Sequence, residues 1–414
     1  MKIKSIKKIN YSDDVYNLHI EDNHNYFAND ICVSNCHSLE EVLCDFITTK
    51  ISKPLLKRNG FTDQEAEQAM WCFGENPENM ALETFIEIVN ESFLPIVKTV
   101  INRLAREAEE TKSMQAINFL QGLTQHHFKW ENLGLEVQAK PNNWILEAEN
   151  IYKNDKKTGK VIDKYIEFTA QPVWASEYLE EKVWSRYDFI LFMSGTILNK
   201  ELFCQINGLN IEDTAYIQMD SPFPVENRPI YYFSKLGKQT FATKELTWGK
   251  QKTVLEKILK KYKNEKGIVH TANYEIQKWV HKEFEHTNRL LTHDSTNRSE
   301  LLQEHYNSEE PTVLVSPSLM TGIDLADDYS RHQTILKIPY PNLKSQKVKK
   351  RMETNKDWYS WRTAVDMQQS YGRSIRSMED HADTYMLDGS FTNFLKYSRK
   401  FLLDWVVNAI QFVD

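Results

Sequence analysis

Five short apolar runs, each ending in polar residues, constrain the fold of this chain more than any other feature. One runs from Tyr187 to Met193 and ends in Ser194-Gly-Thr196. The other four have the same form: Gly267-Ile-Val-His-Thr271, Thr312-Val-Leu-Val-Ser316, Thr334-Ile-Leu-Lys-Ile338 and Thr384-Tyr-Met-Leu-Asp388. Such runs are typical of parallel strands that are buried on both faces. Amphipathic stretches separate them, so the alternation predicts a doubly wound α/β domain over about residues 210–414.

The composition restricts the classes of protein to which this chain can belong. The 414 residues leave room for two or three domains. A formal net charge of −7 argues against a broadly basic nucleic-acid coat, so any nucleic-acid binding must use a local groove. The five cysteines show no metal-ligand spacing. No apolar run is long enough to span a bilayer. We therefore expect a reduced, cytoplasmic protein without a membrane partner.

The region between about residues 50 and 130 has a different, helical texture. Thr62-Asp-Gln-Glu65 has the form of a capping box that opens a helix. Between residues 81 and 106 apolar side chains recur at helical spacing, and Pro95 predicts a kink or break among them. We interpret about residues 50–130 as a mostly helical insertion.

Asn35 and Cys36 are neighbours that can carry out chemistry on the backbone. An asparagine amide can attack its own carbonyl carbon, form a succinimide and cleave the peptide bond that follows. A cysteine directly after it can accept an acyl group as a nucleophile. The dipeptide alone is common, and an ordinary loop is the alternative interpretation.

The surrounding residues resemble the C-terminal motifs of inteins. The resemblance covers residues 1–35 and includes Val15-Tyr-Asn-Leu, then His24, then Ser34-Asn35-Cys36. It implies that Asn35 cyclises, that Cys36 is the first residue after the intein, and that His24 assists proton transfer. Two departures are Ser34, where a histidine is usual, and Asn17, where an aspartate is usual.

The intein resemblance also implies a partner. The chain begins with Met at the length of a split-intein C-terminal fragment, and the N-terminal splicing nucleophile is absent. We therefore expect a separate N-terminal split-intein/helicase fragment, encoded in a bacterial or phage-infected cell. The alternative is a fragment cut from a longer contiguous gene product.

The residues after the proposed splice point resemble a helicase. Cys36-His37-Ser-Leu-Glu-Glu41 looks like the end of a DExH box whose Asp-Glu would lie on the partner, where it would bind Mg²⁺ and orient the hydrolytic water. His37 would couple that site to the second motor domain. Ser194 and Thr196 resemble motif III of the XPD/DinG-like branch of superfamily 2, whose hydroxyls link ATP hydrolysis to nucleic-acid movement.

Further motifs follow in the order of that branch. Val313–Leu325 resembles motif V, in which Gly322 permits a tight turn and Asp324 can bond the nucleotide or a neighbouring motif. Gln369-Ser-Tyr-Gly-Arg-Ser-Ile-Arg376 matches the QxxGRxxR of motif VI. Two arginines three residues apart lie on one helix face, and their guanidinium groups can stabilise a γ-phosphate. We assign Arg376 as the arginine finger and Arg373 as its phosphate or interdomain partner.

Two groups of residues are candidates for binding a single strand of DNA. The helical insertion occupies the slot of the XPD arch, where aromatic residues could stack on bases or could be core: Trp71, His126, His127, Phe128 and Trp130. The basic run before motif VI is a better phosphate-contact candidate, with a solvated loop as the alternative: Lys344, Lys347, Lys349, Lys350 and Arg351.

The sequence contains no G-x-x-x-x-G-K-[ST], so this chain lacks the main phosphate cradle for ATP. The resemblances imply an α/β fold with a complete second and a partial first RecA-like motor domain, an arch-like insertion and a small β-rich intein (Hint) fragment. The expected segments are 1–35 (intein), 36–49 and 131–205 (first motor domain), 50–130 (arch) and 206–414 (second motor domain).

The predicted function is a precursor that splices to give an ATP-dependent DNA helicase with ATP and Mg²⁺ as cofactors. The rival interpretation is a non-enzymatic module that binds nucleic acid or a partner without ever gaining a P-loop. A third, a helicase-like nuclease subunit, has no carboxylate-rich nuclease motif in its favour.

Overall fold

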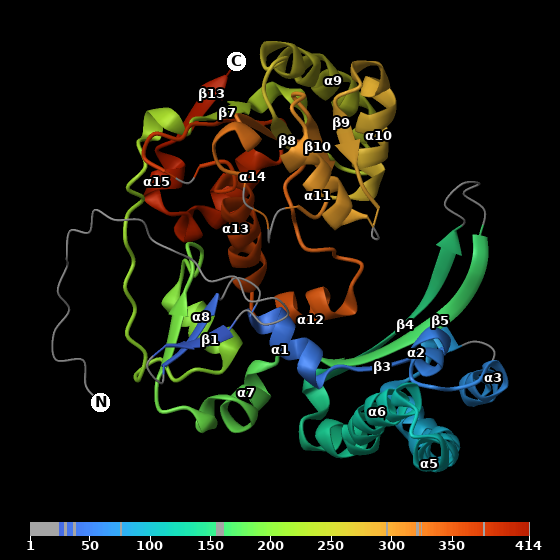
Figure 1. Cartoon of the computed structure of the whole chain (residues 1–414). Helices are drawn as coiled ribbons and strands as arrows, with labels where there is room; N and C mark the ends of the chain where they lie inside the picture. Colours follow the sequence, from blue (N-terminus) through green and yellow to red (C-terminus); the bar gives the residue numbers. More distant parts are fainter. Residues whose placement is uncertain are drawn as a thin grey trace.

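The computed structural model describes residues 25–28, 31–35, 39–74, 77–154, 161–294, 297–319, 323, 325–375 and 377–413. Three units make up this part of the chain: a large sheet domain, a helical unit with a long hairpin, and a small unit beside the first described residues (Figure 1). Six site residues that the sequence indicated lie outside the described residues: His24, Cys36, His37, Gly322, Asp324 and Arg376.

The large domain is built on a seven-stranded sheet in which every neighbouring pair is parallel. The strand order is β13-β7-β12-β11-β8-β10-β9. Four of the five apolar runs lie in this sheet, which confirms the predicted parallel α/β architecture. The strands are β7 (Ile230–Phe233), β8 (Gly267–His270), β9 (Leu290–Thr292), β10 (Val313–Ser316), β11 (His332–Ile335), β12 (Asp383–Met386) and β13 (Ile410–Val413).

Helices cover both faces of this sheet, as continuous apolar strands require. Val269 packs with helices α9 (Lys244–Lys261) and α10 (Tyr274–Phe284). Its neighbour Ile268 packs on the opposite face with Leu301 of α11 (Arg298–Asn307). The remaining helices of this domain are α12 (Gln346–Thr354), α13 (Trp358–Tyr371), α14 (Phe391–Ser398) and α15 (Asp404–Val407).

Helices fill most of the predicted insertion, and the helix start that the capping box predicted is confirmed. Thr62 caps the helix that follows it: the Glu65 amide donates to Thr62 Oγ1 over 3.2 Å, and the Thr62 amide donates to Glu65 Oε2 over 2.8 Å. The helical residues continue past residue 130. The helices are α2 (Lys53–Arg58), α3 (Asp63–Trp71), α4 (Leu82–Ile88), α5 (Leu94–Thr111) and α6 (Met114–Ala139).

Pro95 marks an irregularity, as predicted. A π-helical turn, Val89–Phe93, joins α4 to α5, and Pro95 lies in the first turn of α5. Proline lacks the amide hydrogen of a regular helix interior, so the first turn is where a helix tolerates it. The apolar residues at helical spacing are at most 1% exposed: Phe85, Val89, Phe93, Val97, Val100 and Leu104. Across the described residues, no helix has the length and apolar character that crossing a membrane requires.

A second, antiparallel sheet joins the insertion to the rest of the chain. Its order is β3-β5-β4, from β3 (Thr49–Ser52), β4 (Trp144–Asn154) and β5 (Val161–Pro172). The β4–β5 hairpin curves away from the body of the molecule (Figure 1). Trp130 ties α6 to this sheet, because its indole Nε1 donates to the carbonyl of Lys50 over 3.0 Å.

The small unit contains the fifth apolar run. Its sheet has the order β1-β2-β6, from β1 (Asn25–Ala28), β2 (Ile31–Asn35) and β6 (Ile190–Met193). Helices α1 (Leu39–Ile47), α7 (Ser176–Lys182) and α8 (Lys200–Asn207) accompany it. We expected β6 to be buried on both faces, but Leu191 and Met193 are 45% and 48% exposed. One face of β6 is therefore open in this chain.

Candidate functional site

Polar residues at the carboxyl end of β6 meet helix α13, in which the predicted motif VI begins. Arg373 lies beyond the end of α13 at Tyr371 and not on a helix face as we expected. Ser194 Oγ and Thr196 Oγ1 lie 3.2 Å apart, and Thr196 is buried. From α13, the side-chain amide of Gln369 donates a hydrogen bond to Thr196 Oγ1. The segments predicted to be motifs III and VI, far apart in the sequence, are therefore in direct contact between the small unit and the sheet domain.

Arg373 extends this contact to the predicted motif V. Its guanidinium Nη2 donates to Gln369 Oε1 over 2.9 Å, and Nη1 donates to the carbonyl of Ile323 over 2.8 Å. The side chain is buried, with 7% exposure. Ile323 is the residue between Gly322 and Asp324 in the sequence, and both of those candidates lie outside the described residues. The chain of contacts is Thr196–Gln369–Arg373–Ile323.

His270 adds an uncharged ring to this region, which the sequence interpretation did not single out. It ends β8, is fully buried and lies within electrostatic reach of Arg373. Burial, reinforced by the positive charge of Arg373, lowers the pKa of His270 to about 4. A polar residue that ends an apolar strand was the sequence signal that could have identified it.

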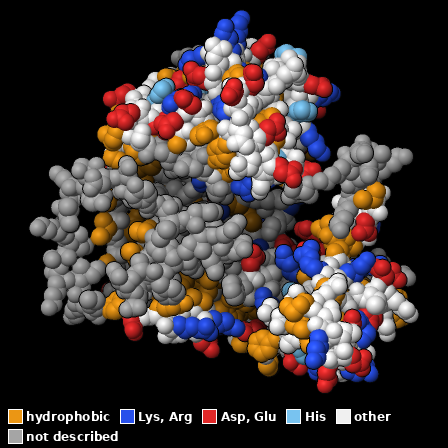
Figure 2. Space-filling model, in the orientation of Figure 1, with side chains coloured by type: hydrophobic (Ala, Val, Ile, Leu, Met, Phe, Trp, Pro, Cys, Tyr) orange, Lys and Arg blue, Asp and Glu red, His pale blue; other side chains and the backbone are white. Residues whose placement is uncertain are grey.

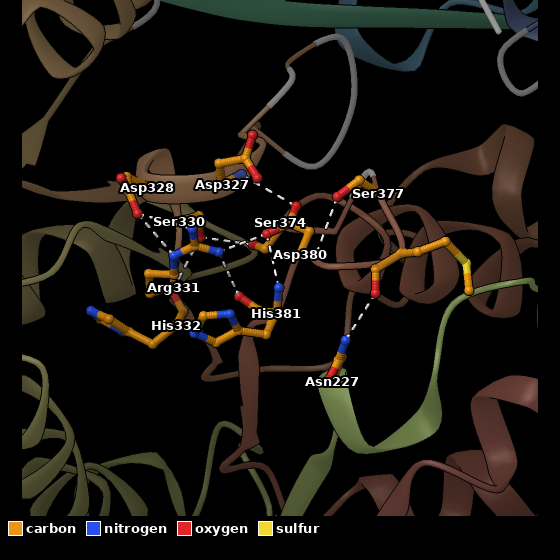
Figure 3. Close-up of polar contacts among 11 residues, drawn as sticks. Asn227, Asp327, Asp328, Ser330, Arg331, His332, Ser374, Ser377, Asp380 and His381 are labelled. Atoms are coloured by element: carbon orange, nitrogen blue, oxygen red, sulfur yellow. Dashed lines mark hydrogen bonds and ion pairs between the residues drawn. The ribbon is translucent and has the colours of Figure 1, made fainter. Parts of the chain in front are cut away.

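The segment that follows α13 is held against the segment that follows motif V (Figure 3). Ser374 Oγ lies 2.7 Å from Ser330 Oγ, and the guanidinium of Arg331 donates to the buried carboxylate of Asp380 over 2.7 Å. The amide of Asp327 donates to the second oxygen of Asp380 over 3.2 Å. Residues on both sides of position 376 are thus anchored to the sheet domain.

Two strand ends at this interface have strained backbone. Leu198, just beyond Thr196, has φ of 65°, and Ala272, just beyond β8, has φ of 59°. Residues with a Cβ rarely adopt this left-handed region, and such strain is concentrated at functional sites. The strained residues after β6 and β8 therefore lie in the same region as the polar contacts described above.

The residues predicted to contact phosphate fall into two groups that differ in exposure. Lys344 and Lys349 are exposed, and Lys350 is half-buried. Lys347 reaches another unit, because its ammonium donates to Gln171 Oε1 of β5 over 3.0 Å. These four lysines leave positive charge near the junction between the sheet domain and the antiparallel sheet.

Arg351 does not have the exposure that we expected of a phosphate contact. Its side chain is buried, with 4% exposure, and forms a two-pronged ion pair with Glu40. Its cationic head is therefore occupied inside the protein, which corrects our sequence-based expectation for this residue.

The intein-related residues are only partly described. Asn35 ends β2, which runs parallel to β6 with Asn35 opposite Met193. The strand that leads into Cys36 therefore lies beside the strand that leads into Ser194. His24, Cys36 and His37 lie outside the described residues, so their contacts stay predictions.

This site can supply only part of an ATP-binding centre. Arg373 offers a guanidinium, and Ser194 and Thr196 offer hydroxyls, all of which suit phosphate oxygens. In the part of the chain that the structure describes, no group of three or more His, Cys, Asp or Glu side chains has a metal-binding arrangement. The expectation that an N-terminal partner supplies the Mg²⁺ ligands stays a prediction.

The fold and the site define a protein of two α/β units whose polar strand ends meet across an interface. Residues 243–408 match a family of proteins described as the helicase C-terminal domain. This part of the chain is therefore similar to the C-terminal domain of helicases.

Two curated relatives are helicases by name. A probable ATP-dependent helicase, YpvA, from Bacillus subtilis is 25% identical over 233 residues, which cover 54% of this chain and 34% of the relative. The ATP-dependent DNA helicase CHL1 from Vanderwaltozyma polyspora is 29% identical over 147 residues, covering 30% of this chain and 18% of the relative. The chain thus spans about a third or less of each relative.

Solved structures of XPD proteins share the fold. An XPD structure without ligand aligns with a TM-score of 0.57 and 17% identity, over 92% of this chain and 76% of that one. A second XPD helicase aligns with a TM-score of 0.54 and 15% identity, over 91% and 67%. The Xpd4 protein of S. tokodaii gives a TM-score of 0.53 at 15% identity, over 92% and 75%.

Proposed function

We propose that this chain supplies the C-terminal portion of an ATP-dependent DNA helicase of the XPD/DinG-like kind. The observation that carries the proposal is the chain of contacts Thr196–Gln369–Arg373–Ile323, which joins three helicase motifs across two units. Such a chain can transmit a change at the nucleotide to both units, as an ATP-driven motor requires. The names of the two curated relatives agree with this activity.

The ATP-binding role of this chain is that of the second motor domain. ATP would supply a γ-phosphate whose negative charge develops toward the arginines of motif VI, Arg373 and Arg376. Ser194 and Thr196 would sense that change from the other unit. Because the chain has no P-loop, we propose that an N-terminal fragment provides the phosphate cradle and the Asp-Glu pair that binds Mg²⁺.

Single-stranded DNA is the proposed substrate. The helical unit lies at the lower right of Figure 2, and lysine and arginine side chains gather on its side that faces the sheet domain. Lys344 and Lys349 are exposed near the same junction. In the helical insertion, Trp71 and Phe128 are 81% and 67% exposed and offer flat faces for base stacking, whereas Trp130 is core.

We further propose that the chain is a precursor from which residues 1–35 are removed by trans-splicing. The position of β2 supports this proposal, because it occupies the place beside β6 from which a DExH box would follow. After splicing, a strand of the partner that ends in Asp-Glu would take that place and be joined to Cys36. Before splicing, β2 of the segment to be excised would occupy the position of this partner strand.

Mass spectrometry tests the splicing proposal. The chain is mixed with the candidate fragment that carries the P-loop and the Asp-Glu pair, and the masses are followed with time. We expect loss of the 35-residue leader and appearance of a larger ligated product. The Asn35→Ala variant should stop C-terminal cleavage, and the proposal is wrong if that variant splices normally.

ATPase measurements on the joined protein test the motor proposal. Arg376→Ala should abolish DNA-stimulated ATP hydrolysis and leave ATP binding largely intact, because an arginine finger acts on the transition state. Unchanged turnover would remove Arg376 from that role. A joined protein that binds DNA and never hydrolyses ATP would favour the non-enzymatic module.

A further inference from the structure

Helix α12 belongs to the sheet domain by sequence, but residues outside that domain bind it at both ends. At its start, the carboxylate of Glu147 accepts from Ser345 Oγ over 3.2 Å and from the amide of Gln346 over 2.9 Å. At its end, the indole of Trp174 donates to Thr354 Oγ1 over 3.0 Å. The antiparallel sheet and the segment after it therefore hold this helix.

The strongest of these attachments lies in the middle of α12. Arg351 Nη1 donates to Glu40 Oε2 over 3.0 Å, Nη2 donates to Glu40 Oε1, and Nε donates to the carbonyl of Val173 over 2.7 Å. The guanidinium also lies over two indole rings, 4.9 Å from the centroid of Trp174 and 5.2 Å from that of Trp358. One arginine thus joins α1, the segment after β5 and the start of α13.

The pair is buried, and its surroundings favour the charged form of Glu40. Burial works against a charged Glu40, but the positive charge of Arg351, with help from Lys347 and hydrogen bonds, holds the pKa of Glu40 below its usual value. The Cys44 thiol adds a hydrogen bond to Glu40 Oε1 over 3.0 Å. Removal of either side chain would leave an uncompensated buried charge, which is strongly destabilising. For that reason we expect the two side chains to stay in this arrangement.

Each of the two helices that this pair joins lies next to a proposed ATPase motif in the sequence. Glu40 lies in α1, which begins directly after the DExH-like residues Cys36 and His37. Arg351 lies in α12, and α13 with Gln369 follows after a short connection; Arg373 lies two residues beyond the end of α13. Figure 1 shows α1 and α12 together at the junction of the units.

We propose that Glu40 and Arg351 are positioning residues that hold α1 to α12 and so align, for ATP hydrolysis, the helices next to the proposed motifs II and VI. This inference rests on the proposed helicase function. The pair holds α1 and α12 together as one body.

Hydrogen–deuterium exchange on the full chain tests the mechanical part without any partner. Arg351→Met and Glu40→Gln should each raise amide exchange in α1 and α12 together by about tenfold or more, and leave α9 and α10 unchanged. The matched control is Arg103→Met, which breaks a similar pair inside the helical insertion: Arg103 contacts both oxygens of Glu65 and the carbonyl of Gly60. Independent exchange of α1 and α12 would overturn the proposal, as would the same effect from Arg103→Met.

A double apolar variant separates positioning from plain stability. Glu40→Leu with Arg351→Met removes both charges, and such replacements commonly keep or raise stability. In the joined protein we expect this variant to melt like the parent, to keep its KM for ATP, and to lose about tenfold or more in kcat. Arg351→Lys keeps the positive charge opposite Glu40, so its kcat should lie between that of the double variant and that of the parent. Full turnover in the double variant would overturn the proposal.

The two experiments fail in different ways. If the joined protein never hydrolyses ATP, the proposed function fails, and the exchange result alone then decides whether the pair joins α1 and α12. If ATP hydrolysis occurs but is indifferent to the double variant, the proposed function stands and the positioning role is wrong.

Discussion

Three histidines of the sheet domain are buried without charge. Burial is the main cause that lowers the pKa of His270 and His305 to about 4 and that of His332 to about 3. The ring of His305 contacts Thr312 and the carbonyl of Tyr329, while both ring nitrogens of His332 lack a partner. Each ring is therefore neutral in the folded state at any pH above about 4.

We predict that acid destabilises this domain well above the pH at which carboxylates titrate. The unfolded chain binds protons at these histidines near pH 6.5, whereas the folded domain does not, so the stability they give is complete above pH 6.5. It is lost progressively as the pH falls from 6.5 towards 4. Urea denaturation across this range measures the effect. His332→Phe, which keeps the stacking on Tyr262, should make the dependence shallower by one proton.

Among the described residues, the hydroxyl of Thr196 has one hydrogen-bond partner outside its own segment, and that partner is Gln369. Thr196→Val keeps the shape and removes the acceptor, so we expect a stability loss of only about 1 kcal/mol. ATP turnover of the joined protein should fall by about tenfold, because the link between motifs III and VI is lost.

Thr363→Val is the matched control for Thr196→Val. Its hydroxyl donates to the carbonyl of Tyr359 within α13 over 2.8 Å, away from the interface. This variant should lose similar stability and keep its turnover. Equal turnover in the two variants would show that the contact between Thr196 and Gln369 has no part in the motor.

At the scale of elements, α6 holds the helical insertion to the antiparallel sheet through Trp130. The indole is 1% exposed, meets the ring of Phe93 edge-on at 5.0 Å and bonds Lys50. Trp130→Ala should destabilise the insertion by about 3–5 kcal/mol. Hydrogen exchange should then rise in α5 and α6 and stay unchanged in the seven-stranded sheet.

Phe128 is a neighbouring control with the opposite expectation. It lies two residues away on α6 and is 67% exposed. Phe128→Ala should leave the stability of the insertion unchanged and weaken binding of single-stranded DNA, measured by fluorescence anisotropy. A stability loss as large as that of Trp130→Ala would contradict the structure.

The elements show where sequence patterns suffice. Strands β8, β10 and β12 were predictable because both of their faces are buried, which leaves an apolar run in the sequence. Strand β9 was not, because its three residues are only half-buried at the sheet edge. The β4–β5 hairpin was missed because much of it is solvated and polar, with no apolar run to mark it.

The candidate site was predictable as a set of residues but not as a set of contacts. The motifs placed Thr196, Gln369 and Arg373, yet the contact between Thr196 and Gln369 joins residues 173 positions apart. The basic run gave no sign that Arg351 turns inward while Lys349 stays exposed. Helical spacing puts Lys347 and Arg351 on one face of α12, and only the packing of α1 decides what that face meets.

At the scale of the whole molecule, the open face of β6 bears on the proposed partner. Phe192 packs against the rings of Trp184 and Phe203 on the covered face. Leu191 and Met193 point to the other side and are nearly half exposed. Parallel strands of this apolar character are normally covered on both faces. The N-terminal fragment proposed above would supply the second cover.

We therefore predict that Met193 becomes protected when the chain is joined to that fragment. In the chain alone, peroxide should oxidise Met193 readily because its thioether is accessible, and in the joined protein the rate should fall by about tenfold or more. Met114, 68% exposed at the start of α6, serves as the control and should be oxidised equally in both. Peptide mass spectrometry gives both rates. If Met193 stayed reactive in a joined protein that hydrolyses ATP, β6 would work with one bare face, and the partner would have to dock elsewhere.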